Sequence, residues 1–208
     1  MTEPAIELVE GFWYPAADRD CRRAVHSWTG PFSRVLPLIT ERTACVQAGG
    51  NVGVWPAKLA SAFKTVYTFE PDALNFHCLA RNATASNIVK FQCALGEGRE
   101  LPVGMLRDPE NCGGHQLQGE GTIPVIALDS LSLSGIGLIY LDIEGYEPRA
   151  LLGARKTIAR CRPVIAIENK GLSEMYGIPK DALEKLIVEG FGYRKADEFA
   201  RDQVYLPC

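Results

Sequence analysis

The sequence is short of positive charge, of histidine and of long apolar runs. It contains 22 Lys and Arg against 25 Asp and Glu, a formal net charge of −3 at pH 7, and three histidines. Nucleic-acid-binding proteins need an excess of basic side chains to neutralise phosphates, so we expect no nucleic-acid partner. A membrane-spanning helix needs roughly 20 consecutive apolar residues, and no stretch reaches that length, so we expect no membrane partner either.

The seven cysteines lack the spacing of a metal or redox motif. No two of them form a C-x-x-C pair, and no histidine stands at zinc-finger spacing from them. An odd and scattered set is typical of free thiols in a reducing compartment, where cysteine packs as a small apolar residue. Residues 1–4 also lack the basic start of a signal peptide. These features predict a cytoplasmic protein.

The length of 208 residues and the 47% apolar composition suit a single core rather than two. Residues 16–28 carry mixed charges, with Val25 and Trp28 on one helical face, and Gly30-Pro31 follows as a breaker. We therefore interpret residues 1–42 as a helical N-terminal appendage and residues 43–208 as the main domain.

From Thr43 onward, short apolar runs alternate with amphipathic segments of helical length. This alternation predicts an α/β fold, in which helices cover both faces of a mostly parallel sheet. The expected strands are 44–47, 66–69, 88–93, 123–128, 136–141 and 164–167, and the expected helices are 56–63, 73–85, 149–160 and 180–189.

Two further segments depart from this alternation. Residues 191–195 and 203–206 are extended pieces joined by a polar stretch, 196–202, that is too short for a crossover helix. They predict an antiparallel hairpin at the sheet edge. Residues 96–121 are rich in Gly, Pro and Asn, and a loop of that length in a small domain indicates a candidate lid.

The stretch "VQAGGNVG", residues 46–53, joins an expected strand to an expected helix through a glycine turn. It nearly fits the dinucleotide pattern G-x-G-x-x-G, with Ala48 in place of the first glycine, and it lacks the Gly-Lys-Ser/Thr of a P-loop. Glu70 ends the next strand, roughly 20 residues on, where a carboxylate accepts both hydroxyl hydrogens of a ribose. The pair predicts an adenosine-containing ligand, either NAD or S-adenosylmethionine, and the C-terminal hairpin favours the second.

Several motifs together carry a family resemblance. The segments "VQAGGNVGVW", "YTFEPD", "IALDSL", "IYLDIEGYEPRALLGA" and "RPVIAIENK" resemble the FkbM-like methyltransferases from about Thr43 to the C-terminus. The most specific part is residues 142–147 followed by 151–154. The resemblance implies a Rossmann-like class I methyltransferase domain over 43–208, with a seven-stranded sheet, S-adenosylmethionine as cofactor and transfer usually to oxygen.

The resemblance also implies a cofactor site at the glycine turn and at the neighbouring strand ends. Its residues are Gln47, Gly49, Asn51, Gly53, Glu70, Pro71, Ala94, Leu95 and Asp142. Two positions depart from the family pattern, because Gln47 replaces the usual aspartate and Tyr140 replaces a common lysine. Gln47 retains an amide for the methionine portion but offers no carboxylate to its ammonium group.

Methyl transfer requires alignment of the acceptor and removal of its proton, so polar groups at the other strand ends are the candidate catalytic residues. These are Asp142, Glu144, Glu168 and Asn169. Glu144 has a structural alternative, charge complementarity to the following helix. Asp142, Glu168 and Asn169 resemble the magnesium-binding set of the catechol O-methyltransferase group, and direct hydrogen bonds to an acceptor hydroxyl are the metal-free alternative.

Other polar and aromatic residues have two interpretations each. His115, in the 96–121 loop, is either a base at neutral pH or a solvated side chain. Trp13, Tyr14 and Trp28 either cover an acceptor pocket or pack the appendage onto the core.

The sequence therefore predicts an S-adenosylmethionine-dependent methyltransferase that acts on a hydroxyl of a sugar-containing or other small-molecule acceptor. A fold that binds the cofactor without turnover and an NAD-linked oxidoreductase are the alternatives.

Overall fold

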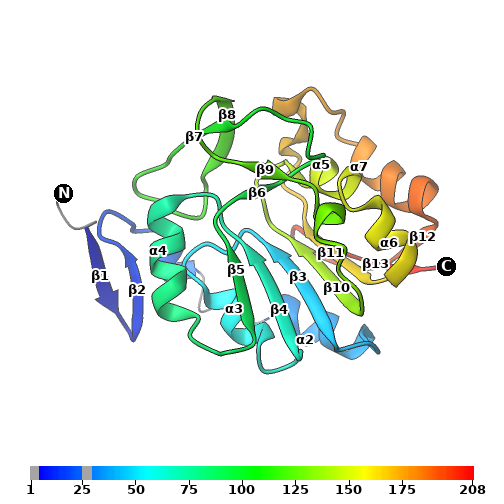
Figure 1. Ribbon diagram of the computed structural model, residues 1–208, viewed down its shortest axis with the longest axis horizontal. Helices are drawn as coiled ribbons and strands as arrows, with labels where there is room; N and C mark the ends of the chain where they lie inside the picture. The colour runs from blue at the N-terminus through cyan, green and yellow to red at the C-terminus, as the bar shows by residue number, and fades with distance from the viewer. Residues whose placement is uncertain (1–4, 25–29) are drawn as a thin grey trace.

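The computed structural model describes residues 5–24 and 30–208, and its centre is a seven-stranded sheet (Figure 1). The strand order is β12-β13-β11-β10-β3-β4-β5. The strands are β3 (Ala44–Ala48), β4 (Thr65–Phe69), β5 (Ile88–Phe91), β10 (Ile136–Leu141), β11 (Val164–Glu168), β12 (Tyr193–Phe199) and β13 (Asp202–Pro207).

The sheet is mixed. Strands β5, β4, β3, β10 and β11 pair in parallel, whereas β13 is antiparallel to both β11 and β12. The seven strands and the C-terminal hairpin are as expected, but the link between β12 and β13 is much shorter than 196–202. Only Ala200 and Arg201 separate the paired residues Phe199 and Asp202, and Ala200 has the positive φ of 54° that a tight hairpin turn requires.

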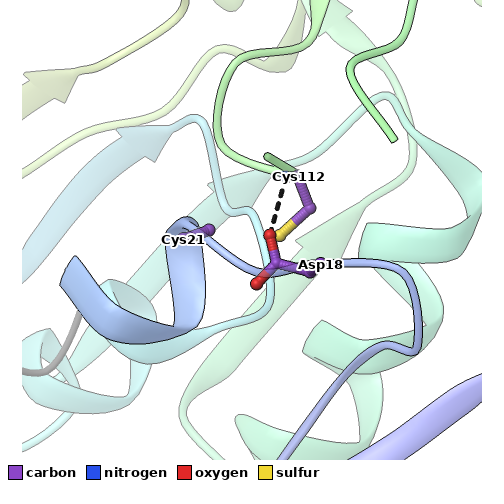
Figure 2. Close-up of side chains that lie close together, drawn as sticks. All are labelled: Asp18, Cys21 and Cys112. Atoms are coloured by element: carbon purple, nitrogen blue, oxygen red, sulfur yellow. Dashed lines mark hydrogen bonds between the residues drawn. The ribbon is translucent and has the colours of Figure 1, made fainter. Parts of the chain in front are cut away.

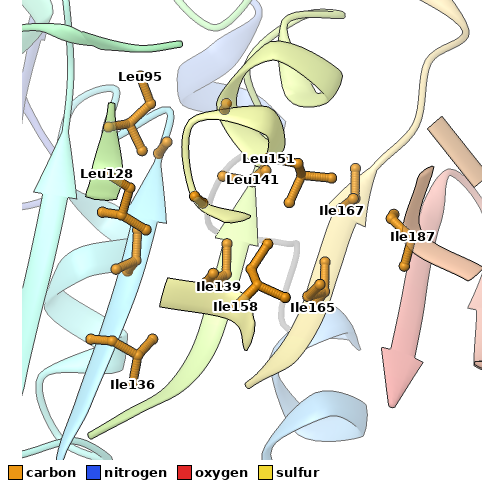
Figure 3. Close-up of a cluster of buried hydrophobic side chains, with 14 of the residues drawn as sticks. Leu95, Leu128, Ile136, Ile139, Leu141, Leu151, Ile158, Ile165, Ile167 and Ile187 are labelled. Carbon is orange, nitrogen blue, oxygen red and sulfur yellow. The ribbon is translucent and has the colours of Figure 1, made fainter. Parts of the chain in front are cut away.

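Helices cover both faces of the sheet, and the alternation of side chains along a strand explains how. In β10, Leu138 and Tyr140 belong to one apolar cluster, and Ile139 and Leu141 to the other. Figure 3 shows the second cluster, in which Ile139 and Leu141 lie with Leu151 and Ile158. The first is covered by α2 (Gly30–Val35), η1 (Leu36–Leu38) and α3 (Val54–Leu59), and the second by α5 (Glu147–Leu152), α6 (Arg155–Cys161) and α7 (Ala182–Lys185).

Three predicted elements differ from the structure. The expected strand 123–128 shrinks to β9 (Val125–Ile126), which pairs with β6 (Ala94–Leu95) outside the main sheet, before η2 (Leu128–Leu131). The expected helix 149–160 is broken into α5 and α6 at Gly153. A Cβ at Gly153 would lie 1.8 Å from the carbonyl oxygen of Gly96, so the two backbones touch there. The last expected helix begins as α7 and widens into the π-helical turn η4 (Leu186–Gly190).

The N-terminal segment, expected to be helical, begins with a β-hairpin, β1 (Ile6–Val9) and β2 (Phe12–Pro15). Glu10 and Gly11 form its turn with φ of 50° and 85°, the combination that favours a two-residue hairpin. The helix that follows, α1, is described only over Cys21–Ala24, and His26 and Trp28 lie outside the described residues.

The hairpin is docked onto α4 (Ala73–Asn82) by Asn82, whose amide donates to the carbonyl of Trp13 and accepts from its N–H, both at 2.8 Å. Tyr14 is buried. For these two aromatics the structure favours packing over a pocket role.

The segment expected as a lid contains a second hairpin, β7 (Val103–Leu106) and β8 (Gln116–Glu120). In Figure 1 it rises above α4 and the ends of the sheet strands. The remaining helical turn is η3 (Leu172–Tyr176), after β11. In the described parts of the chain, every helix is too short or too polar to cross a bilayer.

Candidate functional site

A cavity of about 310 Å³ lies at the carboxyl ends of β3, β4, β10 and β11. Its walls include the segments that follow these strands, residues 93–95 after β5, and Cys21 of α1. The β7–β8 hairpin and its tip, the connecting loop 107–115, also contribute. In a parallel sheet, the carboxyl ends of the strands share one edge, where ligands of α/β proteins bind. The cavity is therefore where the strand-end residues predicted from the sequence can meet.

The glycine turn after β3 is shaped by contact with β10. Gly49 has φ of 83°, and a Cβ on it would lie 1.9 Å from the carbonyl oxygen of Asp142. Asn51, with φ of 46°, turns the chain toward α3. Gly49 and Asn51 both line the cavity.

The amide hydrogens of this turn are already used within the protein. The N–H groups of Gly49 and Gly50 donate to the carbonyl of Phe69 at 3.1 and 2.9 Å, and that of Gly53 donates to Gly50 at 2.9 Å. The N–H of Val52 donates to the side chain of Asn51. The turn thus lacks the free, converging amides that hold a phosphate.

Glu70, which follows β4, lies against the glycine turn. Its carboxylate accepts from the N–H of Asn51 at 2.7 Å and from that of Asp72 at 2.8 Å. The side chain is 5% exposed and lines the cavity. Burial raises the pKa of Glu70 to about 7, although these hydrogen bonds oppose the shift.

Of the other residues predicted for the cofactor, Pro71, Ala94 and Leu95 line the cavity, whereas Gln47 and Gly53 do not. Gln47 is fully buried behind the turn, where it donates to the carbonyl of Gly49 at 2.8 Å and accepts from Thr68 at 2.6 Å. The structure therefore places Gln47 as a support of the turn. Gly53 packs against α4, because a Cβ there would lie 3.1 Å from the Cα of Leu79.

The residues predicted for chemistry are those at the ends of β10 and β11, and not all of them reach the cavity. Asp142, Glu144 and Glu168 line it, but Asn169 does not. The amide of Asn169 donates to Gln203 at 3.2 Å and accepts from the N–H of Gly171 at 3.0 Å, so it holds the backbone after β11.

Lys170 is the centre of this acidic group, although the sequence pattern predicted no role for it. Its Nζ lies 2.5 Å from Glu144, 3.0 Å from Glu168 and 3.4 Å from Asp142. Its side chain is 20% exposed, and it also lines the cavity. A "carboxylate, then Asn-Lys" pattern at a strand end was the only signal, since partners on another strand are invisible in one segment of sequence.

The protonation of this group follows from burial and mutual charge. Burial, and then the nearby Asp142 carboxylate, raise the pKa of Glu168 to about 8. Burial also raises the pKa of Glu144, against the effect of Lys170. For Lys170, burial works to lower the pKa, but the three carboxylates outweigh it and the pKa is raised. Lys170 is thus a cation at neutral pH, and Glu168 holds a proton for much of the time.

Two more residues close to the acidic group around Lys170 were not predicted from the sequence. Arg201, from the turn between β12 and β13, lines the cavity. Asp202 is 3% exposed and pairs with Glu168 across β11 and β13. Burial, and then the charge of Asp142, raise the pKa of Asp202 to about 6.

The loop between β7 and β8 lies against the segment that follows Glu70. Asp72 binds Arg107 at 2.5 Å, and the ring of His115 lies 3.9 Å from the same carboxylate. The amide of Asn75 donates to the carbonyl of Cys112 at 2.8 Å. His115 lines the cavity, but it lies beside Asp72, which follows Glu70 in sequence, and not among Asp142, Glu144 and Glu168.

Comparisons with known proteins identify the domain and the fold. Residues 47–195 match the methyltransferase FkbM domain. The methyltransferase FkbM from Methylobacillus flagellatus KT superposes with a TM-score of 0.51 at 21% identity, over 80% of this chain and 44% of that protein. Trm5b from Pyrococcus abyssi superposes with a TM-score of 0.50 at 12% identity, over 99% of this chain and 56% of that one.

Monomeric WbdD also superposes, with a TM-score of 0.50 at 13% identity, over 91% of this chain and 42% of that protein. The chain thus spans about half the length of these structures, and likenesses at such identities establish the fold. No curated protein matches the sequence.

Proposed function

The chain belongs to the FkbM methyltransferase family, and from this premise we propose that it is an S-adenosylmethionine-dependent methyltransferase whose acceptor is a hydroxyl of a sugar-containing or other small molecule. The observation that carries the proposal is the shared cavity. It is lined by the turn after β3 and by Glu70, and also by Asp142, Glu144 and Glu168. One cavity can therefore hold a cofactor and an acceptor in contact.

The residues at the Glu70 end fit an adenosine. Glu70 offers a buried carboxylate to two ribose hydroxyls, and Ala94, Leu95 and Cys93 offer an apolar surface to a purine. When bound, the cofactor supplies a methyl group already activated on a sulfonium. The ammonium group of its methionine portion needs acceptors. Because Gln47 is buried behind the turn, we assign this role to the carboxylate of Asp142, which follows β10 and lines the cavity.

The same turn argues against the NAD alternative. A pyrophosphate needs free backbone amides at the glycine turn, and those of Gly49, Gly50 and Gly53 are bound to carbonyls. S-adenosylmethionine has no phosphate, so this loss does not affect it.

At the acceptor end, we assign the proton removal to the acidic group around Lys170. A hydroxyl becomes a better nucleophile as its proton passes to a base of pKa near the working pH. The pKa of Glu168, raised to about 8 by burial and by Asp142, is near neutral pH, as a base for this step requires. Lys170 holds Glu144 and Glu168 in position through its contacts of 2.5 and 3.0 Å and offsets their charge.

The proposal is tested by thermal unfolding in the presence of S-adenosylmethionine, its demethylated product S-adenosylhomocysteine, or NAD. We expect the first two to raise the melting temperature and NAD to leave it unchanged. Glu70→Gln should abolish the shift, because an amide cannot accept from Asn51, Asp72 and a ribose together.

Glu147→Gln is the matched control. Glu147 is also a buried acid whose pKa burial raises to about 7 and which accepts from turn amides, those of Ile143 and Gly145, but it does not line the cavity. Its variant should keep the ligand shift. No shift with either sulfonium ligand or product would contradict the proposal. A shift without release of S-adenosylhomocysteine across a panel of hydroxyl acceptors would favour the alternative of a fold that binds the cofactor without turnover.

A further inference from the structure

A second cluster of reactive side chains lies at the edge of the cavity, away from the acidic group around Lys170. Asp18, Cys21 and Cys112 offer one carboxylate oxygen and two sulfur atoms that all lie within 4.8 Å of one another (Figure 2). All three residues are buried. They come from two separate segments, the N-terminal one and the tip of the β7–β8 hairpin.

We propose that Asp18, Cys21 and Cys112 bind a zinc ion, which ties the N-terminal segment to the hairpin tip at the cofactor end of the cavity. Two sulfurs and one carboxylate are a donor set for zinc, whereas magnesium and calcium take oxygen ligands alone. Ligands around a tetrahedral zinc lie roughly 3.5 Å from one another, so pairs now within 4.8 Å must approach by at most about 1.3 Å to reach that spacing.

The carboxylate of Asp18 is already oriented. One oxygen accepts from the N–H of Cys112 at 2.9 Å, drawn as the dashed line in Figure 2, and the other accepts from the N–H of Arg22 at 2.9 Å. Each oxygen keeps a further lone pair for a metal. Hydrogen bonds of this kind fix ligand orientation at metal sites.

The charge of Asp18 has no counter-ion among the residues that the structure describes. No Lys, Arg or His side chain there forms an ion pair with it, and the guanidinium of the adjacent Arg22 is bound to Glu7. A buried carboxylate without a cation is costly unless it is compensated. A divalent cation at this point supplies that compensation.

The fourth position faces the cavity. Cys21, Cys112 and Asn51 all line it. The Nδ2 of Asn51 donates to the sulfur of Cys21 at 3.3 Å, and its Oδ1 accepts from the thiol of Cys112 at 3.5 Å. Three protein ligands with an open position, or with the Asn51 amide oxygen in it, are a known arrangement for zinc. Asn51 also belongs to the glycine turn, so the site adjoins the proposed cofactor pocket without sharing its acidic residues.

The ion would reinforce contacts that already join the two segments. The N–H groups of Arg19 and Asp20 donate to the carbonyl of Glu110 at 2.7 and 3.1 Å. Because a metal adds its binding free energy only to the folded arrangement, zinc should slow hydrogen exchange in 12–24 and 107–115.

The test uses the reduced 208-residue chain, stripped of metal by a chelator and then given zinc or cobalt(II) alone. We expect one equivalent of zinc per chain by elemental mass spectrometry, and a thiolate-to-cobalt charge-transfer band with cobalt. Cys21→Ser and Cys112→Ser should each lose both signals. Cys93→Ser is the matched control, because Cys93 is a buried cysteine that lines the same cavity but does not belong to the cluster, and it should keep both signals.

The wild-type cobalt spectrum alone keeps the proposal falsifiable if a serine variant does not fold. Absence of the band from the reduced wild-type protein would overturn it, as would equal zinc uptake by the Cys21→Ser, Cys112→Ser double variant. A Cys21–Cys112 disulfide whose reduction restores no metal uptake would also overturn it. None of these readouts requires methyl transfer, so the test of the zinc site is independent of the test of the proposed function.

Discussion

The carboxylate of Glu70 accepts the backbone N–H of Asn51 at 2.7 Å, across 19 positions of sequence. This contact joins the end of β4 to the glycine turn after β3, so the acid and the turn form one wall of the cavity. The second oxygen accepts from Asp72, which fixes the carboxylate plane. Any ligand that touches the turn therefore meets a carboxylate held in a single orientation.

We predict that the affinity for S-adenosylmethionine rises with pH through about 7. Burial raises the pKa of Glu70 to about 7, so the ligand-free carboxyl is partly protonated at neutral pH. Ribose hydroxyls donate to the ionised form, which lowers this pKa on binding and releases a proton. A shift of one unit corresponds to about a tenfold change in affinity. Calorimetry in buffers of different ionisation enthalpy measures both the affinity and the proton release. Glu147→Gln should leave the dependence of affinity on pH unchanged. A flat profile would contradict this role of Glu70.

Stability should fall as pH rises from about 5 to about 8. Burial raises the pKa of Glu147 from 4.5 to about 7, so between these values the folded chain holds a proton that the unfolded chain has lost. The unfolded state then binds fewer protons, and the free energy of unfolding decreases with pH. In Glu147→Gln, the total decrease in the free energy of unfolding over this pH range should be smaller by up to about 3 kcal/mol. Urea unfolding across this range gives the comparison; an unchanged slope in the variant would disprove the assignment.

Lys170→Met should destabilise the fold by about 3 kcal/mol and remove turnover, because it leaves Glu144 and Glu168 buried without their cation. Lys195→Met is the control. Lys195 also contacts two glutamates, at 2.9 and 3.0 Å, but these are half exposed, and such pairs contribute about 1 kcal/mol or less. Chemical unfolding of both variants measures the difference. Equal losses would show that Lys170 is no more important to stability than a surface lysine.

Gly49→Ala should prevent correct folding or cost more than about 4 kcal/mol. The new Cβ would lie 1.9 Å from the carbonyl of Asp142, in addition to the strain of φ at 83°. Gly119→Ala has a comparable φ of 62° but nothing within 4 Å of its Cβ, so it isolates the backbone strain of about 1–2 kcal/mol. Circular dichroism and thermal unfolding report both. A stable Gly49→Ala protein would mean that the turn and β10 separate readily.

The sequence was most informative where the period of apolar residues is unambiguous. Residues 136–141 and 164–167 were predicted as strands and form β10 and β11, because continuous apolar runs of this length suit strands buried on both faces. The helix expected over 149–160 failed at Gly153, where contact with Gly96 forbids a side chain. That contact joins residues 57 positions apart, and periodicity within a segment cannot reveal it.

At the site, the sequence determined which strand ends carry polar groups, since Glu70, Asp142 and Glu168 each follow an apolar run. The tertiary structure decided how those groups interact. It placed Gln47 behind the turn and Asn169 beneath Gly171, and it brought Lys170 among three carboxylates. It also brought Cys21 close to Cys112, 91 positions away. Local pattern fixes strand, helix and turn, whereas burial, pKa and partner identity depend on contacts between distant segments that exist only once the chain has folded.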